Sequence, residues 1–467
     1  MIFKIAFRNI FRNTRRSVMT LLTIAVGAVA NLVFGAYVIY IFLGIQGTAI
    51  QAFGHLQVFQ KGYFDYGSGN PGAYAIDDYL GLMKLLKEDP VIGPRLAVIT
   101  PTQAIGGIAG NFAADRSKTF FGTGFIPSDR DRMRSWQEGG TSFVGSHSSG
   151  MQDAEISHGV VGTGLARILG LCEPLHLTRC PQLPPHEGTV LPKAGAASTA
   201  NLAELAQRDL PAGSPAPSSS EPRIDLLAAT AGGAPNVVSL YVERAEPQTV
   251  KEYDDNYIGM NLVLAQQLLY GRGTPKASAI VLQLRHSKDM DLVRERLQAL
   301  FQERNLSLEV RDFTEIYSSY RQIIGFFTSI FTFISVIIGV VVLFTVANTM
   351  GMSVMERVEE IGTARAMGLR RQGIRSQFLA EGAMLGVLGG TAGVILATIV
   401  VFIVNHSGLT WVPPGNSLPV PLRLDMFGRL SLVVGIWVGL ALVATIASWF
   451  PANRASQMPV VDALRHV

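Results

Sequence analysis

The stretch Met355-Glu-Arg-Val-Glu-Glu-Ile-Gly-Thr-Ala-Arg-Ala-Met-Gly368 is dense in charge and lies between two strongly apolar segments. The 34 residues of 322–355 and the 41 residues of 382–422 include no Asp, Glu, Lys or Arg. Gly362 costs a helix roughly 1 kcal/mol relative to Ala, which indicates a bend or a close contact, and Gly368 stands where a left-handed residue ends a helix. The stretch therefore predicts a short polar helix held against a membrane surface.

Four apolar runs are long enough to cross a bilayer. They cover about Val18–Ile45, Phe326–Met350, Ala383–Val404 and Leu430–Phe450. An alternative for the first run is a signal peptide cleaved after Ala28-Val-Ala30, but the apolar run continues well beyond that site. Because 48% of the 467 residues are hydrophobic and 16% are charged, composition also favours a membrane protein.

The positions of the basic residues orient these spans. Residues 1–16 carry five basic residues and no acidic one, with apolar residues on the other helical face, which predicts an amphipathic helix along an anionic inner leaflet. Five more basic residues separate the second and third spans, whereas 411–429 has only Arg423 and Arg429. The positive-inside rule then places both termini in the cytoplasm and residues 61–321 outside. The net charge of +4 is small and argues against nucleic acid as a partner.

The sequence predicts an α+β membrane protein, with four transmembrane helices and a large mixed α/β extracytoplasmic domain inserted between helices 1 and 2. The expected segments are a cytoplasmic amphipathic helix (1–16), helix 1 (17–45), the extracytoplasmic domain (46–322), helix 2 (323–352), a charged loop that holds the short polar helix (353–376), helix 3 (377–405), an extracytoplasmic loop (406–429), helix 4 (430–451) and a cytoplasmic tail (452–467).

Within the inserted domain, two distant stretches share a strand and helix pattern. The first has strands at Leu56–Gln60, Leu96–Thr100 and Thr119–Phe125 and a helix at Asp77–Glu88 with Asp77 as its cap. The second predicts strand 277–284, helix 288–303 and strand 307–310. We therefore expect one α/β subdomain (about 55–130 and 275–320), interrupted by an insertion (about 131–274). Pro192–Pro222 is rich in Ala, Ser, Pro and Gly and predicts a flexible excursion.

A resemblance to a known family rests on the charged stretch and on the residues that come after it in the chain. Its residues are Arg357, Glu360-Ile361-Gly362, Arg365-Ala366, Gly368, Ile374, Phe378, Glu381, Gly389-Gly390 and Gly393. This pattern resembles the permease domain of the FtsX/MacB family, the membrane subunits of mechanotransmission ABC transporters. Gly54-His-Leu-Gln-Val58 is similar to the sequence at this point in the lipoprotein-releasing (LolC/LolE-like) branch. The C-terminal stretch from Pro451 to Arg465 resembles the cytoplasmic ending of the family, and a basic stop-transfer tail is the alternative. The interrupted α/β subdomain is similar to the family's extracytoplasmic domain, in which a membrane-proximal α/β subdomain is split by a β-rich insertion.

The resemblance implies a cytoplasmic coupling helix that sits in a cleft of an ATPase subunit. The residues expected to couple to the ATPase are Glu356, Arg357, Glu359, Glu360, Ile361 and Arg365. It also implies two ATPase subunits, a second copy or a paralogous permease, and a periplasmic carrier or adaptor, in a bacterial inner membrane. ATP and Mg²⁺ would bind the partner ATPase, and this chain would bind no cofactor. An ordinary basic loop is the alternative for the stretch, although such a loop requires no particular Glu or Gly.

Glycines at four-residue spacing predict close approach of helix backbones in the third and fourth spans. They are Gly382, Gly386, Gly389, Gly390 and Gly393 in the third span, and Gly435 and Gly439 in the fourth. Chance is the alternative for any single pair, because Gly is common in membrane helices. Glu381, at the inner end of the third span, is expected to reach the interface rather than to relay protons.

Two features of the insertion resemble sites that bind a phosphate or a metal ion, or that form a disulfide. Gly159–Gly170 contains a Gly-x-x-Gly-x-Gly cluster, but the Walker A order G-x-x-x-x-G-K-[ST] appears nowhere in these 467 residues, so we expect a packing role and an ATPase on another chain. Cys172 and Cys180, the two cysteines, are expected to form a disulfide in an oxidising compartment. A zinc site with His176 and His186, or two free thiols, are the alternatives. No nucleophile motif such as G-x-S-x-G is present, so no enzymatic site is expected.

The expected function is that of a permease subunit that couples ATP hydrolysis by a partner to an extracytoplasmic movement, for release or export of a lipoprotein or lipid. The alternatives are an FtsX-like transmitter that regulates a cell-envelope hydrolase, a MacB-like efflux component, and a receptor without an ATPase. A cargo handler should show an apolar exterior groove.

Overall fold

The computed structural model describes residues 8–9, 12, 14–67, 72–138, 148–177, 180, 222–248, 250–412 and 419–459. Several expectations fall wholly or largely outside these residues. They concern most of the amphipathic helix 1–16, the excursion at 192–222, His186, and the tail beyond Pro459.

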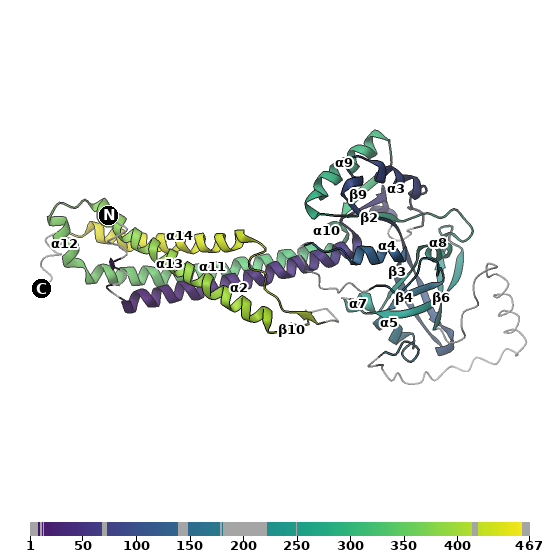
Figure 1. The fold of residues 1–467 in the computed structure, drawn as a ribbon, viewed down its shortest axis with the longest axis horizontal. Helices are drawn as coiled ribbons and strands as arrows, with labels where there is room; N and C mark the ends of the chain where they lie inside the picture. The colour runs from purple at the N-terminus through teal and green to yellow at the C-terminus, as the bar shows by residue number, and fades with distance from the viewer. Residues whose placement is uncertain are drawn as a thin grey trace, which may run out of the picture.

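Four long helices form one end of an elongated molecule (Figure 1). They are α2 (Thr14–Phe53), α11 (Ser318–Glu356), α13 (Arg371–His406) and α14 (Leu430–Gln457). All four are long and apolar enough to cross a membrane, so the four long apolar helices that the sequence predicted are present. In Figure 1, α2 and α11 also continue past the other two helices to reach the α/β domain.

A short helix, α12 (Val358–Ala366), lies at the end of the bundle that points away from the α/β domain (Figure 1). We call this the far end of the bundle and the opposite end the domain end. Gly368 follows α12 with a φ of 95°, the left-handed conformation that the sequence predicted for the end of this helix. Gly362 is buried within α12, in agreement with the predicted close contact.

The glycines of α13 let three helices approach closely. A Cβ added at Gly386 would lie 2.8 Å from the Cα of Ala441 in α14, and one at Gly393 would lie 2.3 Å from the Cβ of Ala28 in α2. Gly382, Gly389 and Gly390 have similarly close neighbours in α14 or α2. The packing predicted for the third span is confirmed.

The packing predicted for the fourth span is wrong within this chain. A Cβ added at Gly435 or Gly439 would meet no described atom within 4 Å. The two glycines share a face of α14 that points away from its neighbours, because a spacing of four residues puts both on the same side of a helix.

The α/β domain holds a nine-stranded sheet in the order β3-β7-β4-β6-β5-β2-β8-β1-β9. Its first part pairs β1 (Leu56–Gln60) with β8 (Ala279–Leu284) and β9 (Leu308–Asp312), and β8 with the start of β2 (Leu96–Asn111). Helices α3 (Tyr79–Glu88) and α9 (Met290–Glu303) add apolar side chains to the same core. The two distant stretches thus form one unit, as the sequence predicted.

The second part of the sheet joins the end of β2 to five further strands. They are β3 (Arg116–Phe125), β4 (His158–Gly162), β5 (Arg223–Ala229), β6 (Pro235–Glu246) and β7 (Tyr257–Asn261). The helices here are α4 (Pro127–Arg134), α5 (Thr163–Ile168), α7 (Lys251–Asp254) and α8 (Leu262–Tyr270). Residues 103–125 therefore pair with the β-rich part, although the sequence placed them in the other subdomain, because β2 runs through both parts.

Short elements complete the described chain. They are α10 (Phe313–Ile316), the hairpin β10 (Thr410–Trp411) and β11 (Val420–Pro421), and the turns η1 (Tyr63–Gly67), η2 (Gly93–Arg95), η3 (Phe112–Ala114) and η4 (Ser287–Asp289). One predicted cap is wrong: Asp78, not Asp77, caps α3 by accepting from the Gly81 amide at 2.9 Å. Asp77 instead forms an ion pair with Lys276 at 2.6 Å.

Candidate functional site

A buried ion pair joins two helices at the far end of the bundle. Arg357, at the start of α12, lies with its Nη1 3.0 Å from Oε1 of Glu381 in α13, and the two residues are 5% and 3% exposed. The side-chain amide of Asn9 donates to the same Glu381 oxygen at 2.6 Å. The expectation that Glu381 reaches the interface is wrong, because its charge is neutralised inside the chain.

Two more ion pairs tie the start of the chain to the far end. Arg16 pairs with Glu356 at 2.6 Å, and Arg12 pairs with Glu360. These side chains are 36–56% exposed. Exposed ion pairs contribute only about 0–1 kcal/mol each. These two pairs therefore stabilise the fold little, but they hold Arg12 and Arg16 beside α11 and α12.

The residues expected to couple to an ATPase have different environments. Ile361 is 6% exposed and packs among the four long helices. Arg365 donates to the carbonyl of Met458 at 2.6 Å, and so holds the end of α14. Glu359 is exposed, and it forms no ion pair with any residue that the structure describes.

The far end also exposes apolar side chains that the sequence analysis did not single out. Met367 and Met355 are 79% and 60% exposed, and Leu369 is 44% exposed. The sequence signal that could have identified these apolar residues is their position near Glu359 and next to Gly368, which ends the helix. The exposed surface of α12 and its flanks, formed by Met355, Glu359, Thr363, Met367 and Leu369, is called the α12 surface below.

A cavity of about 1180 Å³ lies between the domain end of the bundle and the sheet. Its walls come from α2, α11, both parts of the sheet, and the β10–β11 hairpin. Most of the lining is aliphatic or aromatic, including Phe53, Phe59, Phe121, Phe125, Phe326 and Phe327. A large apolar cavity with a few polar groups is the usual form of a binding site for a small molecule.

Several polar atoms in the cavity wall have no partner within the described chain. They are Oγ1 of Thr48, Oγ1 of Thr100, Nε of Arg130 and Nε1 of Trp411. Thr100 is 2% exposed, so bulk water does not surround its hydroxyl. Buried polar atoms normally find a partner. These four groups can therefore donate hydrogen bonds to a molecule bound in the cavity.

Two tyrosines beside the cavity stay neutral. Burial raises the pKa of Tyr253 and Tyr257 far above the usual value for a phenol. Their rings stack with centroids 5.0 Å apart, so they form one aromatic wall.

His55, in the Gly54-His-Leu-Gln-Val58 motif, has a structural role. Its Nδ1 accepts the Leu284 amide proton at 3.0 Å, so the neutral ring carries its proton on Nε2, 3.1 Å from Oγ of Ser287. Nε2 therefore donates to Ser287 and cannot act as a base toward it. Burial lowers the pKa of His55 from 6.5 to about 4, which keeps the ring neutral.

The Gly-x-x-Gly-x-Gly cluster is occupied by a carboxylate of this chain. Asp254 accepts from the amides of Thr163 and Gly164, at the start of α5, at 2.9 and 2.7 Å. A Cβ added at Gly162 would lie 2.0 Å from the Asp254 carbonyl oxygen. The amides that could hold a phosphate are thus already bonded, in agreement with the packing role predicted for this cluster.

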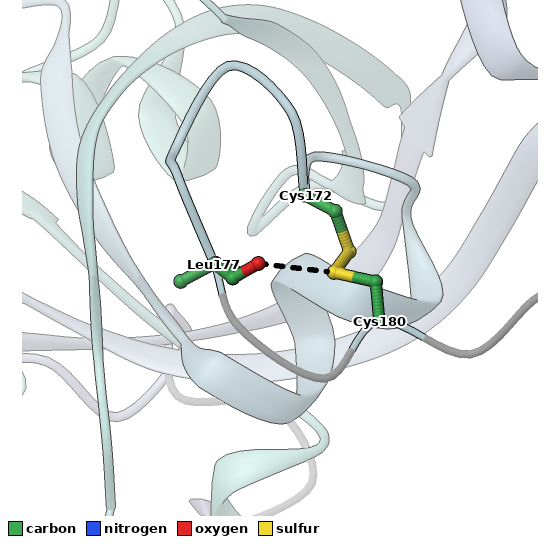
Figure 2. The surroundings of a disulfide bond; sticks show 3 residues. All are labelled: Cys172, Leu177 and Cys180. Carbon is green, nitrogen blue, oxygen red and sulfur yellow. Dashed lines mark hydrogen bonds between the residues drawn. A yellow bond between two sulfur atoms is a disulfide. The ribbon is translucent and has the colours of Figure 1, made fainter.

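Cys172 and Cys180 form a disulfide, so the zinc and free-thiol alternatives are wrong (Figure 2). The Sγ of Cys180 lies 3.6 Å from the carbonyl oxygen of Leu177, which places the bond against its own short loop. The sequence predicted this pairing. The disulfide belongs to the α/β domain, at the opposite end of the molecule from α12.

One group of side chains that the sequence analysis missed could hold a metal ion. Ligand atoms of Glu155, His158 and Glu243 lie within 4.8 Å of one another, and Glu243 is exposed. His158 also packs against the ring of Tyr241 with centroids 5.8 Å apart. Charged side chains at a surface often lie this close together without binding a metal ion, so this group alone does not indicate a metal site.

Comparisons with known proteins find relatives for part of the helical bundle. Residues 332–460 match the family model described as "FtsX-like permease C-terminal". An uncharacterized ABC transporter permease of Methanocaldococcus jannaschii is 26% identical over 227 residues, which cover 47% of this chain and 53% of that protein. The macrolide export ATP-binding/permease protein MacB of Hyphomonas neptunium is 32% identical over 164 residues, covering 35% of this chain and 22% of that protein.

A third relative is the probable syringafactin export ATP-binding/permease protein SyfD of Pseudomonas syringae pv. syringae, 23% identical over 221 residues, which cover 46% of this chain and 31% of that protein. The chain thus spans about half or less of the length of these relatives. Residues 332–460 contain α12, Glu381 and all the glycines that pack α13. Residues 332–460 therefore match an FtsX-like permease segment, and the chain is similar to ABC transporter permeases, including proteins named MacB.

Proposed function

We propose that this chain is the transmembrane permease subunit of a bacterial ABC transporter, in which α12 is the coupling helix. ATP binding by two partner ATPase subunits would move α12, and α2 and α11 would carry that movement to the α/β domain. A second copy of the chain, or a paralogue, would complete the complex. The partner ATPase would bind ATP and Mg²⁺.

The observation that carries this proposal is the attachment of α12 to the bundle. Arg357 and Ile361 fasten one side of α12 inside the chain, while the α12 surface remains open on the other side. A helix that is anchored on one side and exposed on the other can receive force from a partner and pass it on. The similarity of residues 332–460 to FtsX-like permeases supports the same role.

The orientation follows from charge and redox chemistry. Among the basic residues that flank the four spans, most lie at the far end, which favours the cytoplasmic side of an inner membrane. The Cys172–Cys180 disulfide lies in the α/β domain, which favours an oxidising compartment such as the periplasm. Both arguments support the proposal that α12 lies inside and the α/β domain outside.

The apolar cavity favours a transporter that handles cargo. It lies where α2 and α11 leave the expected membrane region, and its walls are mostly apolar. The work proposed for the complex is release or export of a lipid or a lipoprotein from the outer face of the inner membrane. A periplasmic carrier or adaptor would accept the cargo.

A second candidate is MacB-like export, supported by the relatives named MacB and SyfD. An FtsX-like transmitter that regulates a cell-envelope hydrolase is a third candidate, and it would need no cavity. The contents of the cavity separate the transmitter from the two transport functions.

The test is a copurification of the tagged chain in mild detergent, comparing the parent with Glu359→Lys. Glu359 is the sharpest probe, because it forms no ion pair within the described chain whereas Glu360 pairs with Arg12. We expect an ATPase subunit to accompany the parent and to be lost, or uncoupled from the membrane subunit, in the variant. The matched control is Glu295→Lys, an exposed carboxylate of α9 in the α/β domain.

The control should retain the ATPase and its activity. If neither the parent nor the variant brings down an ATPase, while both insert into the membrane, the coupling role of α12 is wrong. A receptor without an ATPase then becomes the better description of the chain.

A further inference from the structure

We propose that the cavity at the domain end binds an acyl-chain amphiphile with an anionic head group, drawn from the bilayer, and that Arg130 binds its negative charge. This inference rests on the proposed function, since it gives a chemical class to the cargo or ligand of that cavity. It concerns the α/β domain and the domain ends of α2 and α11, and so it involves residues outside the FtsX-like segment as well as Trp411 and Val420 within it.

The apolar body of the ligand follows from the size and chemistry of the walls. At about 1180 Å³, the cavity exceeds the range of about 300–1,000 Å³ that is usual for small-molecule sites. Ile41, Ile45, Ile323 and Phe327 line it from two long helices, whereas Phe121 and Tyr253 line it from the sheet side. A flexible hydrocarbon chain removes such surfaces from water without requiring directional bonds.

The negative head group follows from Arg130, the one Lys or Arg in the described lining. Its Nη1 donates to the Ala52 carbonyl at 2.7 Å, and its guanidinium carbon lies 5.6 Å from the centroid of the Phe125 ring. Its guanidinium also hydrogen-bonds the Tyr257 hydroxyl, but its buried Nε has no partner among the described residues. Glu252, the one carboxylate of the described lining, is exposed and forms no ion pair with Arg130. A cation in such apolar surroundings is stabilised when an anion completes its hydrogen bonds.

Two hydroxyls add hydrogen-bonding capacity beside this cation. Oγ1 of Thr100 and Oγ1 of Thr48 are buried in the lining without a partner in the described chain. A hydroxyl can donate to a carboxylate, phosphate or ester oxygen. Together with Nε1 of Trp411, the wall thus offers one charged and three neutral donors among apolar side chains, which is the pattern that an amphiphile requires.

The bilayer is the source to which the geometry points. Phe326 lines the cavity and is 63% exposed, on the same helix as the exposed apolar side chains Phe333 and Val336 of the expected membrane span. The apolar surface of α11 therefore continues from the span to the cavity. A lipid can move along this surface with its chain in contact with apolar side chains throughout.

Fluorescence quenching in the full-length chain tests the proposal. The reporter variant keeps Trp411, which lines the cavity, and replaces Trp136, Trp437 and Trp449 by Phe. The probe is 9,10-dibromostearate, whose bromine atoms quench a nearby tryptophan, and the neutral probe is its methyl ester. A second variant keeps only Trp449, 51% exposed near the far end, and measures partition of the probe into the detergent micelle.

We expect saturable quenching of Trp411 by dibromostearate, with the methyl ester binding about tenfold or more weakly, because the ester cannot form a charge-assisted hydrogen bond with Arg130. Arg130→Gln should weaken binding of the acid by a similar factor and leave the ester unchanged. Arg132→Gln is the matched control, because Arg132 lies on the same helix, is 62% exposed and pairs with Asp129. This control should bind both probes like the parent.

Equal, unsaturated quenching of Trp411 and Trp449 would overturn the proposal, and so would equal affinity for acid and ester. If Arg130→Gln does not give a monodisperse protein, the ratio of acid to ester affinity in the parent decides alone. The assay needs no ATPase, so its failure is distinct from failure of the coupling role tested with Glu359→Lys.

Discussion

Arg357, the residue immediately before α12, and Glu381 of α13 lie 24 positions apart and form a buried ion pair of 3.0 Å at the far end of the bundle. Removing one partner leaves a buried charge without compensation, at a cost of about 3–5 kcal/mol. We expect Glu381→Leu or Arg357→Met to lower the thermal midpoint in detergent strongly. The double variant should recover most of the loss, because both charges are then gone.

The exposed pair of Arg16 and Glu356 is the control for that experiment. Glu356→Gln should change the midpoint little, since this pair is 36–43% exposed. If the double variant at Arg357 and Glu381 is as unstable as each single variant, the pair is not the source of the stability.

The contact between α13 and α2 depends on Gly393. Gly393→Val should separate the helices and cost about 1–3 kcal/mol through overpacking, because even a Cβ here would lie 2.3 Å from the Cβ of Ala28. The matched change is Gly439→Val in α14, where a Cβ meets no described atom within 4 Å. Limited proteolysis or thermal unfolding should affect only the Gly393 variant. Equal destabilisation by Gly439→Val would indicate that a second copy of the chain contacts this face.

The α/β domain should lose stability as the pH falls below about 6.5, because His55 is neutral and buried in the folded state. Its pKa is about 4 when folded against 6.5 as a model value, so the unfolded chain binds more protons between these values. The stability contribution is fully present above pH 6.5 and is lost toward pH 4. Between pH 7.5 and pH 5 the expected loss is about 2 kcal/mol.

Thermal unfolding at pH 7.5 and pH 5, compared with His55→Gln, measures this contribution. Carboxylates with lowered pKa values, such as Asp89 and Glu246, stay ionised over this interval and so do not obscure it. An unchanged pH dependence in His55→Gln would show that another group is responsible.

The Cys172–Cys180 disulfide should stabilise the β-rich part of the domain by about 2–3 kcal/mol, the amount that the entropy model gives for a loop with a separation of eight residues. Cys172→Ser with Cys180→Ser should unfold at a lower temperature than the parent under oxidising conditions. Under reducing conditions the two proteins should unfold alike. In intact cells, a membrane-impermeant maleimide should label these cysteines only after reduction if the domain faces outward.

The sequence predicted the elements of this fold better than the partners of its side chains. Apolar runs of about 20 or more residues predicted four long helices, and Gly368 predicted the end of α12, because hydrophobic length and backbone conformation are local properties. The pairing of Arg357 with Glu381 was not predicted, since it joins two helices through a turn whose geometry the sequence does not specify. For the same reason Ile361 and Arg365, expected on the partner-facing side, lie against their own bundle.

The cavity could be anticipated in kind but not in position. An apolar groove was expected for a cargo handler, yet its lining draws on residues from Ile41 to Val420, which only the folded chain brings together. Arg130 illustrates the limit. In the sequence it is one of four charged residues in a row, 129–132, and nothing local distinguishes it from Arg132.

The lengths of α2 and α11 set a scale for movement across the molecule. At 1.5 Å per residue, the 40 residues of α2 make a rod about 60 Å long, twice the hydrocarbon thickness of a bilayer. A rod of this length that pivots by only about 5° at one end displaces the other by about 5 Å, the rise of one helical turn. Because β2 is shared by both parts of the sheet, a tilt of α2 by a few degrees would move both parts together by about one helical turn.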